Sequence, residues 1–159
     1  SPYDNQINQL NIQLNSTYVV YGAQGSNKKR KQIKEDENAM MLGTANMTSR
    51  TLSKGGRAYR NKSWDMVDAF EVEDFQMSSV PQVQLPDTMK TMSNSQKLAY
   101  VETKKSERLD IQNQIKVLGK KRADFVKVER AKMSIESQLD EVIISAIIKQ
   151  AESKNYSFE

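Results

Sequence analysis

The longest regular pattern of the chain covers residues 93–133. This stretch contains no proline and only one glycine, Gly119, and it is rich in Lys, Arg, Glu, Gln, Leu and Ile, which lose little side-chain freedom in a helix. Ser93 and Gln96 have the spacing of a capping box, in which each side chain accepts a hydrogen bond from the other residue's backbone N–H. The sequence therefore predicts one long helix over residues 93–133.

The apolar positions of this long helix do not form a continuous stripe. Those of its second half follow a repeat of about 3.5 residues, and they are Ile111, Ile115, Leu118, Phe125 and Met133. Arg122 interrupts the repeat, and only Leu98 and Val101 extend it upstream. Because a coiled coil needs three or four clean heptads, this pattern argues against a long homodimeric zipper.

The clearest amphipathic pattern follows directly. Its apolar residues recur at helical spacing, and they are Leu139, Val142, Ile143, Ala146, Ile147 and Ala151. Ser134 or Ser137 supplies a candidate N-cap, so the sequence predicts a separate helix over about residues 137–152. Since that helix needs an apolar partner and its link to the long helix is short, we expect the two to pack antiparallel, forming a helical hairpin over residues 93–159.

The N-terminal third begins with a predicted helix that ends near Asn15. Ser1 is its expected N-cap and Pro2 its first helical residue. Its apolar stripe consists of Tyr3, Ile7, Leu10 and Leu14. Residues 17–21 are β-branched or aromatic and predict a short strand or extended segment. No second convincing strand occurs in the sequence, so we expect its partner in a neighbouring domain, or else a segment that simply packs extended.

The middle of the chain predicts short helices and an irregular connector. We expect helices over residues 28–42 and 45–54, the second stopped by two consecutive glycines. Ser63 is the expected cap of a further short helix over residues 64–70, which contains the only tryptophan, Trp64. Prolines then predict an irregular connector over residues 75–86, followed by at most one helical turn. The expected fold class is mainly α, in three segments: 1–25, 26–92 and 93–159.

Charge is distributed in blocks of alternating sign. The net charge is +4, but residues 1–62 carry +6, residues 63–96 carry −5, residues 97–132 carry +6 and the remainder carries −3. A charged fraction of 28% against 37% apolar residues favours an elongated chain with much solvated surface. We expect opposite blocks to face each other, with the acidic segment 65–74 lying against the basic long helix.

Composition excludes several kinds of chemistry. The chain has no cysteine and no histidine, so it can hold no disulfide, thiol nucleophile, Ser-His-Asp triad or imidazole-bound zinc. The acidic cluster in 65–74 lacks the spacing of a calcium-binding loop, and residues 22–25 lack that of a phosphate-binding loop. We therefore predict no enzyme activity and no catalytic, metal or cofactor site. The candidate anchors for packing or interaction are Tyr3, Tyr18, Tyr21, Trp64 and Asp65.

The basic run and the lengths of the apolar runs indicate whether nucleic acid or a membrane could be a partner. The basic run at residues 28–34 could contact phosphates, but no aromatic residues are interleaved for base stacking and three acids follow it, which favours a solvated helix face. No apolar run reaches the roughly 18 residues of a membrane span, and no secretory leader opens the chain. The chain starts at Ser1 without Met, so we expect any targeting signal to lie upstream.

Several blocks of the sequence resemble a known region. Residues 1–22 and 59–69, together with Leu85, Pro86, Met89 and Met92, are similar to the segment that follows the von Willebrand factor type A (VWA) domain in bacterial VWA-domain proteins. The resemblance implies an upstream Rossmann-like domain, often with a metal-ion-dependent adhesion site built on a D-x-[ST]-x-S motif. No such motif occurs here, so that metal site is not transferred to this chain. The resemblance also implies a periplasmic or extracytoplasmic location.

Together these observations favour a non-catalytic helical interaction or structural module of a VWA-domain protein. Residues 1–25 would form the junction with the VWA-type domain, and the expected partners are that domain and a further protein. No small-molecule substrate is expected, and nucleic acid is disfavoured as a partner. The alternatives are a purely structural helical linker, or a basic adaptor that binds nucleic acid or an anionic surface.

Overall fold

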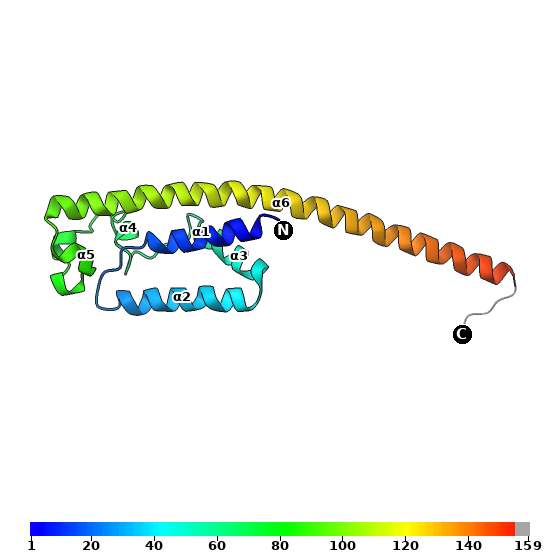
Figure 1. The fold of residues 1–159 in the computed structure, drawn as a ribbon, viewed down its shortest axis with the longest axis horizontal. Helices are drawn as coiled ribbons and strands as arrows, with labels where there is room; N and C mark the ends of the chain where they lie inside the picture. Colours follow the sequence, from blue (N-terminus) through cyan, green and yellow to red (C-terminus); the bar gives the residue numbers. More distant parts are fainter. Residues whose placement is uncertain (155–159) are drawn as a thin grey trace. The chain divides into compact units, whose positions relative to one another are not determined.

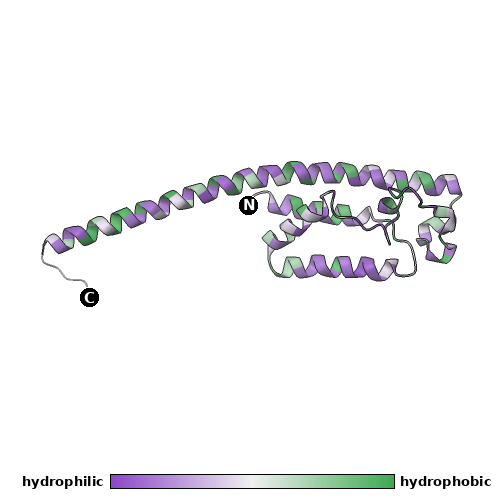
Figure 2. Ribbon diagram, turned by 180° about the vertical axis from the view of Figure 1, so that it is seen from behind, coloured by the Kyte–Doolittle hydropathy of each residue, from purple (hydrophilic) through white to green (hydrophobic). Residues whose placement is uncertain are grey.

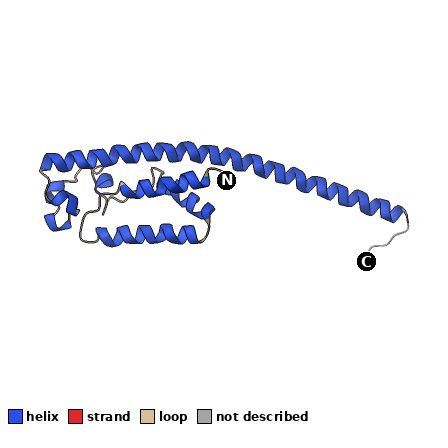
Figure 3. Ribbon diagram, viewed as in Figure 1, coloured by secondary structure: helices blue, strands red, loops and turns tan. Residues whose placement is uncertain are grey.

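The structure is a computed structural model, and it describes residues 1–154. Within that range the chain is mainly helical, as predicted, and no residue belongs to a β-strand (Figure 3). The elements in order are α1 (Asp4–Ser16), α2 (Gly25–Met41), α3 (Thr44–Lys54), α4 (Met66–Ala69), the 3₁₀ turns η1 (Met77–Ser79) and η2 (Gln82–Gln84), α5 (Asp87–Lys90) and α6 (Asn94–Ser153). The chain divides into two compact units at Lys121 and Arg122, and each unit is described by itself.

Helix α6 is continuous from Asn94 to Ser153. The predicted capping box at its start is present: the Ser93 N–H donates to Gln96 Oε1 at 2.9 Å, and the Gln96 N–H donates to Ser93 Oγ at 3.2 Å. The predicted separate helix over 137–152 and the antiparallel hairpin are wrong, because Ser134 and Ser137 both lie inside α6. No glycine or proline follows Gly119 within the helix, and a serine in a helix interior costs only a few tenths of a kcal/mol, so nothing interrupts α6 there.

Helix α1 begins at Asp4 rather than at the predicted N-cap. Ser1 bonds to the Asp4 carboxylate, through its hydroxyl at 2.6 Å and its ammonium group at 2.8 Å, instead of capping a backbone N–H. The predicted stripe is buried at Ile7, Leu10 and Leu14. Figure 1 shows α1 between α2 and the first half of α6, so this stripe faces the interior of the first unit.

The predicted helices of residues 28–42 and 45–54 correspond to α2 and α3. Helix α2 starts earlier than predicted, at Gly25, and Gly43 separates the two helices with a φ of +120°, which favours glycine. Helix α3 ends at Lys54, immediately before the predicted glycine stop. Helix α4 covers only four residues, and its predicted cap is wrong, because the Ser63 hydroxyl accepts a hydrogen bond from Lys28 Nζ. Residues 75–86 form an irregular connector as predicted, interrupted by η1 and η2.

The extended segment at residues 17–21 has its partner within the same chain. Val20 and Asp65 form a single antiparallel bridge, flanked by hydrogen bonds from the Tyr21 N–H to the Trp64 carbonyl and from the Met66 N–H to the Val19 carbonyl. A partner strand from a neighbouring domain is therefore not needed. The pairing links two segments more than forty residues apart in sequence, and it brings residues 64–66 to the end of α1.

The first unit has two apolar clusters. One lies between α1 and α6 and contains Leu10, Leu14, Ile111 and Ile115. The other gathers the extended segment, α4, α5 and the start of α6, and it contains Val19, Met66, Val67, Leu85, Met89 and Val101. Buried polar residues lie alongside both clusters, and these carry the candidate site.

Candidate functional site

Arg108 is a buried cation on the inward face of α6, with 5% of its surface exposed. Its Nη1 donates to Asp65 Oδ2 at 2.6 Å and to Asp68 Oδ1 at 3.0 Å. Its Nε and Nη2 donate to the Thr17 hydroxyl and carbonyl, at 3.0 and 2.9 Å. The guanidinium thus ties α6 to the end of α1 and to α4. The predicted approach of the acidic segment to the long helix is confirmed at Asp65 and Asp68.

Tyr18 completes this cluster as an aromatic platform. Its ring stacks on Trp64, with ring centroids 5.5 Å apart. The Arg108 Cζ lies 4.4 Å from the Tyr18 centroid and the Lys29 Nζ lies 4.6 Å from it. Both cations are therefore within the range of attraction to the electron-rich face of the ring. The cluster of Tyr18, Trp64, Asp65 and Arg108, with Lys29, is called the Arg108 cluster below.

Burial dominates the electrostatics of the Arg108 cluster. It raises the pKa of Tyr18 and also the pKa of Asp65, although Arg108 and the Val19 N–H partly offset the effect at Asp65. Burial by itself would lower the pKa of Arg108, but the hydrogen bond and charge of Asp65 and the charge of Asp68 raise it. Lys29 has a pKa of about 8, because burial and then the nearby charge of Lys54 disfavour its protonated form.

A second buried polar cluster joins α1, α2 and α3 around Lys54, which is 1% exposed. The Lys54 Nζ donates to Asn11 Oδ1, Asn15 Oδ1 and Asp36 Oδ2, each at 2.7 Å. Arg50 Nε also donates to Asp36, at 2.6 Å. Burial alone would raise the pKa of Asp36, but hydrogen bonds from these side chains lower it, whereas burial lowers the pKa of Lys54. We call this the Lys54 cluster.

In each cluster the most buried cation, Arg108 or Lys54, is paired with a carboxylate, whereas Lys29 donates to the Asn15 carbonyl. The pairing with a carboxylate offsets the cost of removing the charges from water. Among residues 1–154, no group of three or more Asp or Glu side chains is arranged to hold a metal ion. These contacts hold α1, α2, α3, α4 and α6 together within the first unit.

The five predicted anchors fall into two places. Tyr18, Trp64 and Asp65 meet in the Arg108 cluster. Tyr21 is adjacent: it pairs with Trp64 through the backbone and meets Phe75 edge to face at 5.5 Å. Tyr3 lies apart from them, at the start of α1. The structure thus brings four of the five together as packing residues inside the first unit.

Sequence reasoning missed Arg108 and Lys54. A signal existed for Arg108, because it precedes Ile111 by three residues and Ile115 by seven and so shares their buried face. Lys54 likewise follows Met47 by seven residues, on the buried face of α3. A cation in an apolar helical register indicates a buried ion pair, but the spacing alone does not identify the acids that neutralise it.

The second unit carries a different feature, which we call the distal apolar face of α6. It consists of large apolar side chains that are 42–68% exposed, namely Met133, Ile135, Leu139, Val142, Ile143, Ile144, Ile147 and Ile148. Figure 2 shows hydrophobic residues recurring along this part of the helix. No helix among the described residues is long and apolar enough to cross a membrane.

A scan against protein-family models, a search of curated proteins and a search of solved structures each found no match to this chain.

Proposed function

We propose that this chain is a non-catalytic helical module that makes protein–protein contacts through the distal apolar face of α6. The observation that carries the proposal is the exposure of eight large apolar side chains within residues 133–148. These side chains point around much of the helix circumference, because each residue turns the helix by about 100°. Folded proteins rarely leave so much large apolar surface in water unless another surface covers it. A helix with such a face fits the apolar groove or helix of a partner.

The charges around this face favour a polypeptide partner over a membrane surface. Residues 133–152 carry the acids Glu136, Asp140, Glu141 and Glu152 and the single base Lys149. Helices that lie on membranes usually present Lys and Arg to anionic headgroups. An acidic border instead complements a partner whose apolar groove has a basic rim.

Two observations support a non-catalytic role. The chain has neither histidine nor cysteine, the side chains that most often act as base and nucleophile near neutral pH. Arg108 bonds to Asp65 and Lys54 bonds to Asp36, so these buried charges act in packing.

We further propose that this chain is part of a longer parent protein, a bacterial VWA-domain protein located outside the cytoplasm. The support is the set of sequence blocks at 1–22 and 59–69 that resemble the region after a VWA domain. The same two blocks pair with each other through the Val20–Asp65 bridge, so they form one structural element. A D-x-[ST]-x-S-type motif on a strand end in the sequence upstream of Ser1 would support the proposal.

The contact proposal can be tested by methionine oxidation. Met133 lies on the distal apolar face and is 68% exposed, and Met41, at the end of α2, is 85% exposed and serves as the internal control. In the purified chain, diluted until it sediments as a monomer, we expect hydrogen peroxide to oxidise both at similar rates. In cells that express the parent protein, we expect Met133 to be oxidised several-fold more slowly than Met41.

Equal rates at the two methionines in cells would contradict the proposal and favour a purely structural linker. Vesicles of phosphatidylcholine, with or without phosphatidylserine, are the second control. They should leave the ratio of rates in the purified chain unchanged. Protection of Met133 by vesicles alone would contradict a polypeptide partner.

A further inference from the structure

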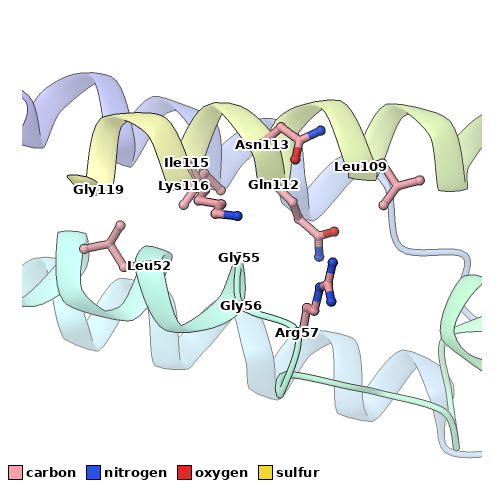
Figure 4. A pocket seen from close by; sticks show the side chains of 10 residues that line it. All are labelled: Leu52, Gly55, Gly56, Arg57, Leu109, Gln112, Asn113, Ile115, Lys116 and Gly119. Carbon is pink, nitrogen blue, oxygen red and sulfur yellow. The ribbon is translucent and has the colours of Figure 1, made fainter. Parts of the chain in front are cut away.

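A cavity of about 410 Å³ lies between the end of α3 and the first half of α6, within the first unit. This volume falls in the range of small-ligand sites. Leu52, Gly55 and Gly56 line one side, and Ile115 and Gly119 lie on the other (Figure 4). We call it the α3–α6 pocket.

Glycines set the close approach of the two helices around this pocket. A Cβ atom added to Gly55 would lie 2.8 Å from Ile115 Cγ2, and one added to Gly119 would lie 2.7 Å from Leu52 Cδ2. Any larger residue at these positions would push into the opposite helix. The exposed apolar surface of the pocket comes from Leu52 and Leu109, because Ile115, although it lines the pocket, is only 2% exposed.

The polar side of the pocket offers only cations and amides. Its charged lining residues are Arg57 and Lys116, Gln112 and Asn113 add side-chain amides, and no Asp or Glu lines it. Figure 4 shows Arg57, from the turn after α3, and Gln112, from α6, reaching toward each other, and Lys116 extending toward Gly55. Unlike Arg50, Lys54 and Arg108, neither Arg57 nor Lys116 bonds to a carboxylate among the described residues.

We propose that the α3–α6 pocket binds a small organic carboxylate with an aliphatic body. The planar guanidinium of Arg57 matches a carboxylate with two parallel hydrogen bonds, and Lys116 adds a second positive charge. The aliphatic body would cover Leu52 and Leu109, the apolar lining residues that keep exposed surface. This pocket lies in the first unit and does not use the distal apolar face, so the inference is independent of the proposed function.

The test is a titration of the ¹⁵N-labelled full chain with sodium hexanoate, followed by backbone amide chemical shifts. We expect saturable shift changes at Gly55, Gly56 and Gly119, with Gly22, which lies outside the pocket, unchanged. Removing both cations in Arg57→Gln/Lys116→Gln should weaken hexanoate binding about tenfold or more, since each charge-assisted hydrogen bond contributes appreciably. The matched control Lys62→Gln/Lys120→Gln removes the same charge from exposed residues outside the pocket and should bind as the unaltered chain does.

Two further ligands test separately whether binding needs the negative charge and whether it needs the aliphatic body. Hexan-1-ol lacks the charge and sodium sulfate lacks the aliphatic body, so each should bind at least several-fold more weakly than hexanoate. Equal binding of sulfate and hexanoate, equal weakening by the control variant, or shift changes that do not saturate at the three pocket glycines would each overturn the inference. An unchanged Gly22 resonance in every variant verifies that the fold is retained.

Discussion

Arg108 is held in the interior of the first unit by two carboxylates and by Thr17. Replacing it with methionine leaves Asp65 buried without a cation, and leaves Asp68 with only Arg60, whose Nη1 lies 4.0 Å from Oδ1. Breaking a buried ion pair on one side costs about 3–5 kcal/mol, so we expect Arg108→Met to lower the free energy of unfolding by that amount. Urea denaturation followed by the fluorescence of Trp64, the only tryptophan, measures the change.

The control for Arg108→Met is the substitution of Lys104, which lies one helical turn away on α6. Lys104 pairs with Glu107 at 2.8 Å on the surface of α6, and exposed pairs contribute about 0–1 kcal/mol. Lys104→Met should therefore change stability by less than about 1 kcal/mol. A similarly small loss for Arg108→Met would show that the Arg108 cluster does not hold the unit together.

Lys29 should make stability depend on alkaline pH. Its pKa is about 8 in the folded chain against 10.5 ordinarily, because burial and Lys54 disfavour its charge. Between these two values the unfolded chain binds the additional proton, so stability rises with pH. We expect the free energy of unfolding to increase between about pH 7.5 and pH 9.5 by more in the unaltered chain than in Lys29→Met. Urea denaturation across that range measures both, and parallel pH profiles would refute the expectation.

At the scale of elements, the continuity of α6 distinguishes two roles for Ser137. If Ser137 capped a separate helix, its replacement by alanine would cost about 0.5–2 kcal/mol. Inside a continuous helix, alanine is the better helix former by a few tenths of a kcal/mol. We therefore expect Ser137→Ala to keep or slightly raise the helical signal and the melting temperature in circular dichroism. A clear decrease would instead indicate a helix start at this residue.

Some elements could be predicted correctly and others could not, because some sequence signals involve only neighbouring residues and others involve residues far apart in the chain. The capping box of Ser93 and Gln96, the glycine stop after α3 and the stripe of α1 involve residues within one or two turns, so they could be found. The predicted boundary at Ser137 is wrong because serine is tolerated inside a helix and no glycine or proline lies near it. The partner of residues 17–21 could not be found by strand propensity, since residues 64–66 form only one bridge with them.

At the scale of the whole molecule, we expect the net charge of +4 not to produce an extended surface that binds polyanions. In the basic run of residues 28–34, three cations already bond within the chain: Lys28 to Ser63, Lys29 to the Asn15 carbonyl, and Arg30 to Asn27. We therefore expect the chain to elute from heparin below about 0.15 M salt, where screening weakens the remaining surface charges.

The variant Lys31→Gln/Lys34→Gln tests whether the remaining cations of the run matter. Its elution should shift only slightly from that of the unaltered chain. Retention of the unaltered chain above about 0.15 M salt, lost in this variant, would instead support the basic adaptor that binds nucleic acid or an anionic surface.

The sequence by itself determined the helical class, most helix positions and the exclusion of thiol and imidazole chemistry, because periodicity, caps and composition are properties of neighbouring residues. Only the tertiary structure decided which charges are buried. Arg108 reaches Thr17 across 91 positions of the sequence, and Lys54 meets Asp36 across 18. Such pairs depend on how α1, α3, α4 and α6 pack, and no local pattern specifies that packing. The same holds for the α3–α6 pocket, whose walls come from segments that only the folded chain places side by side.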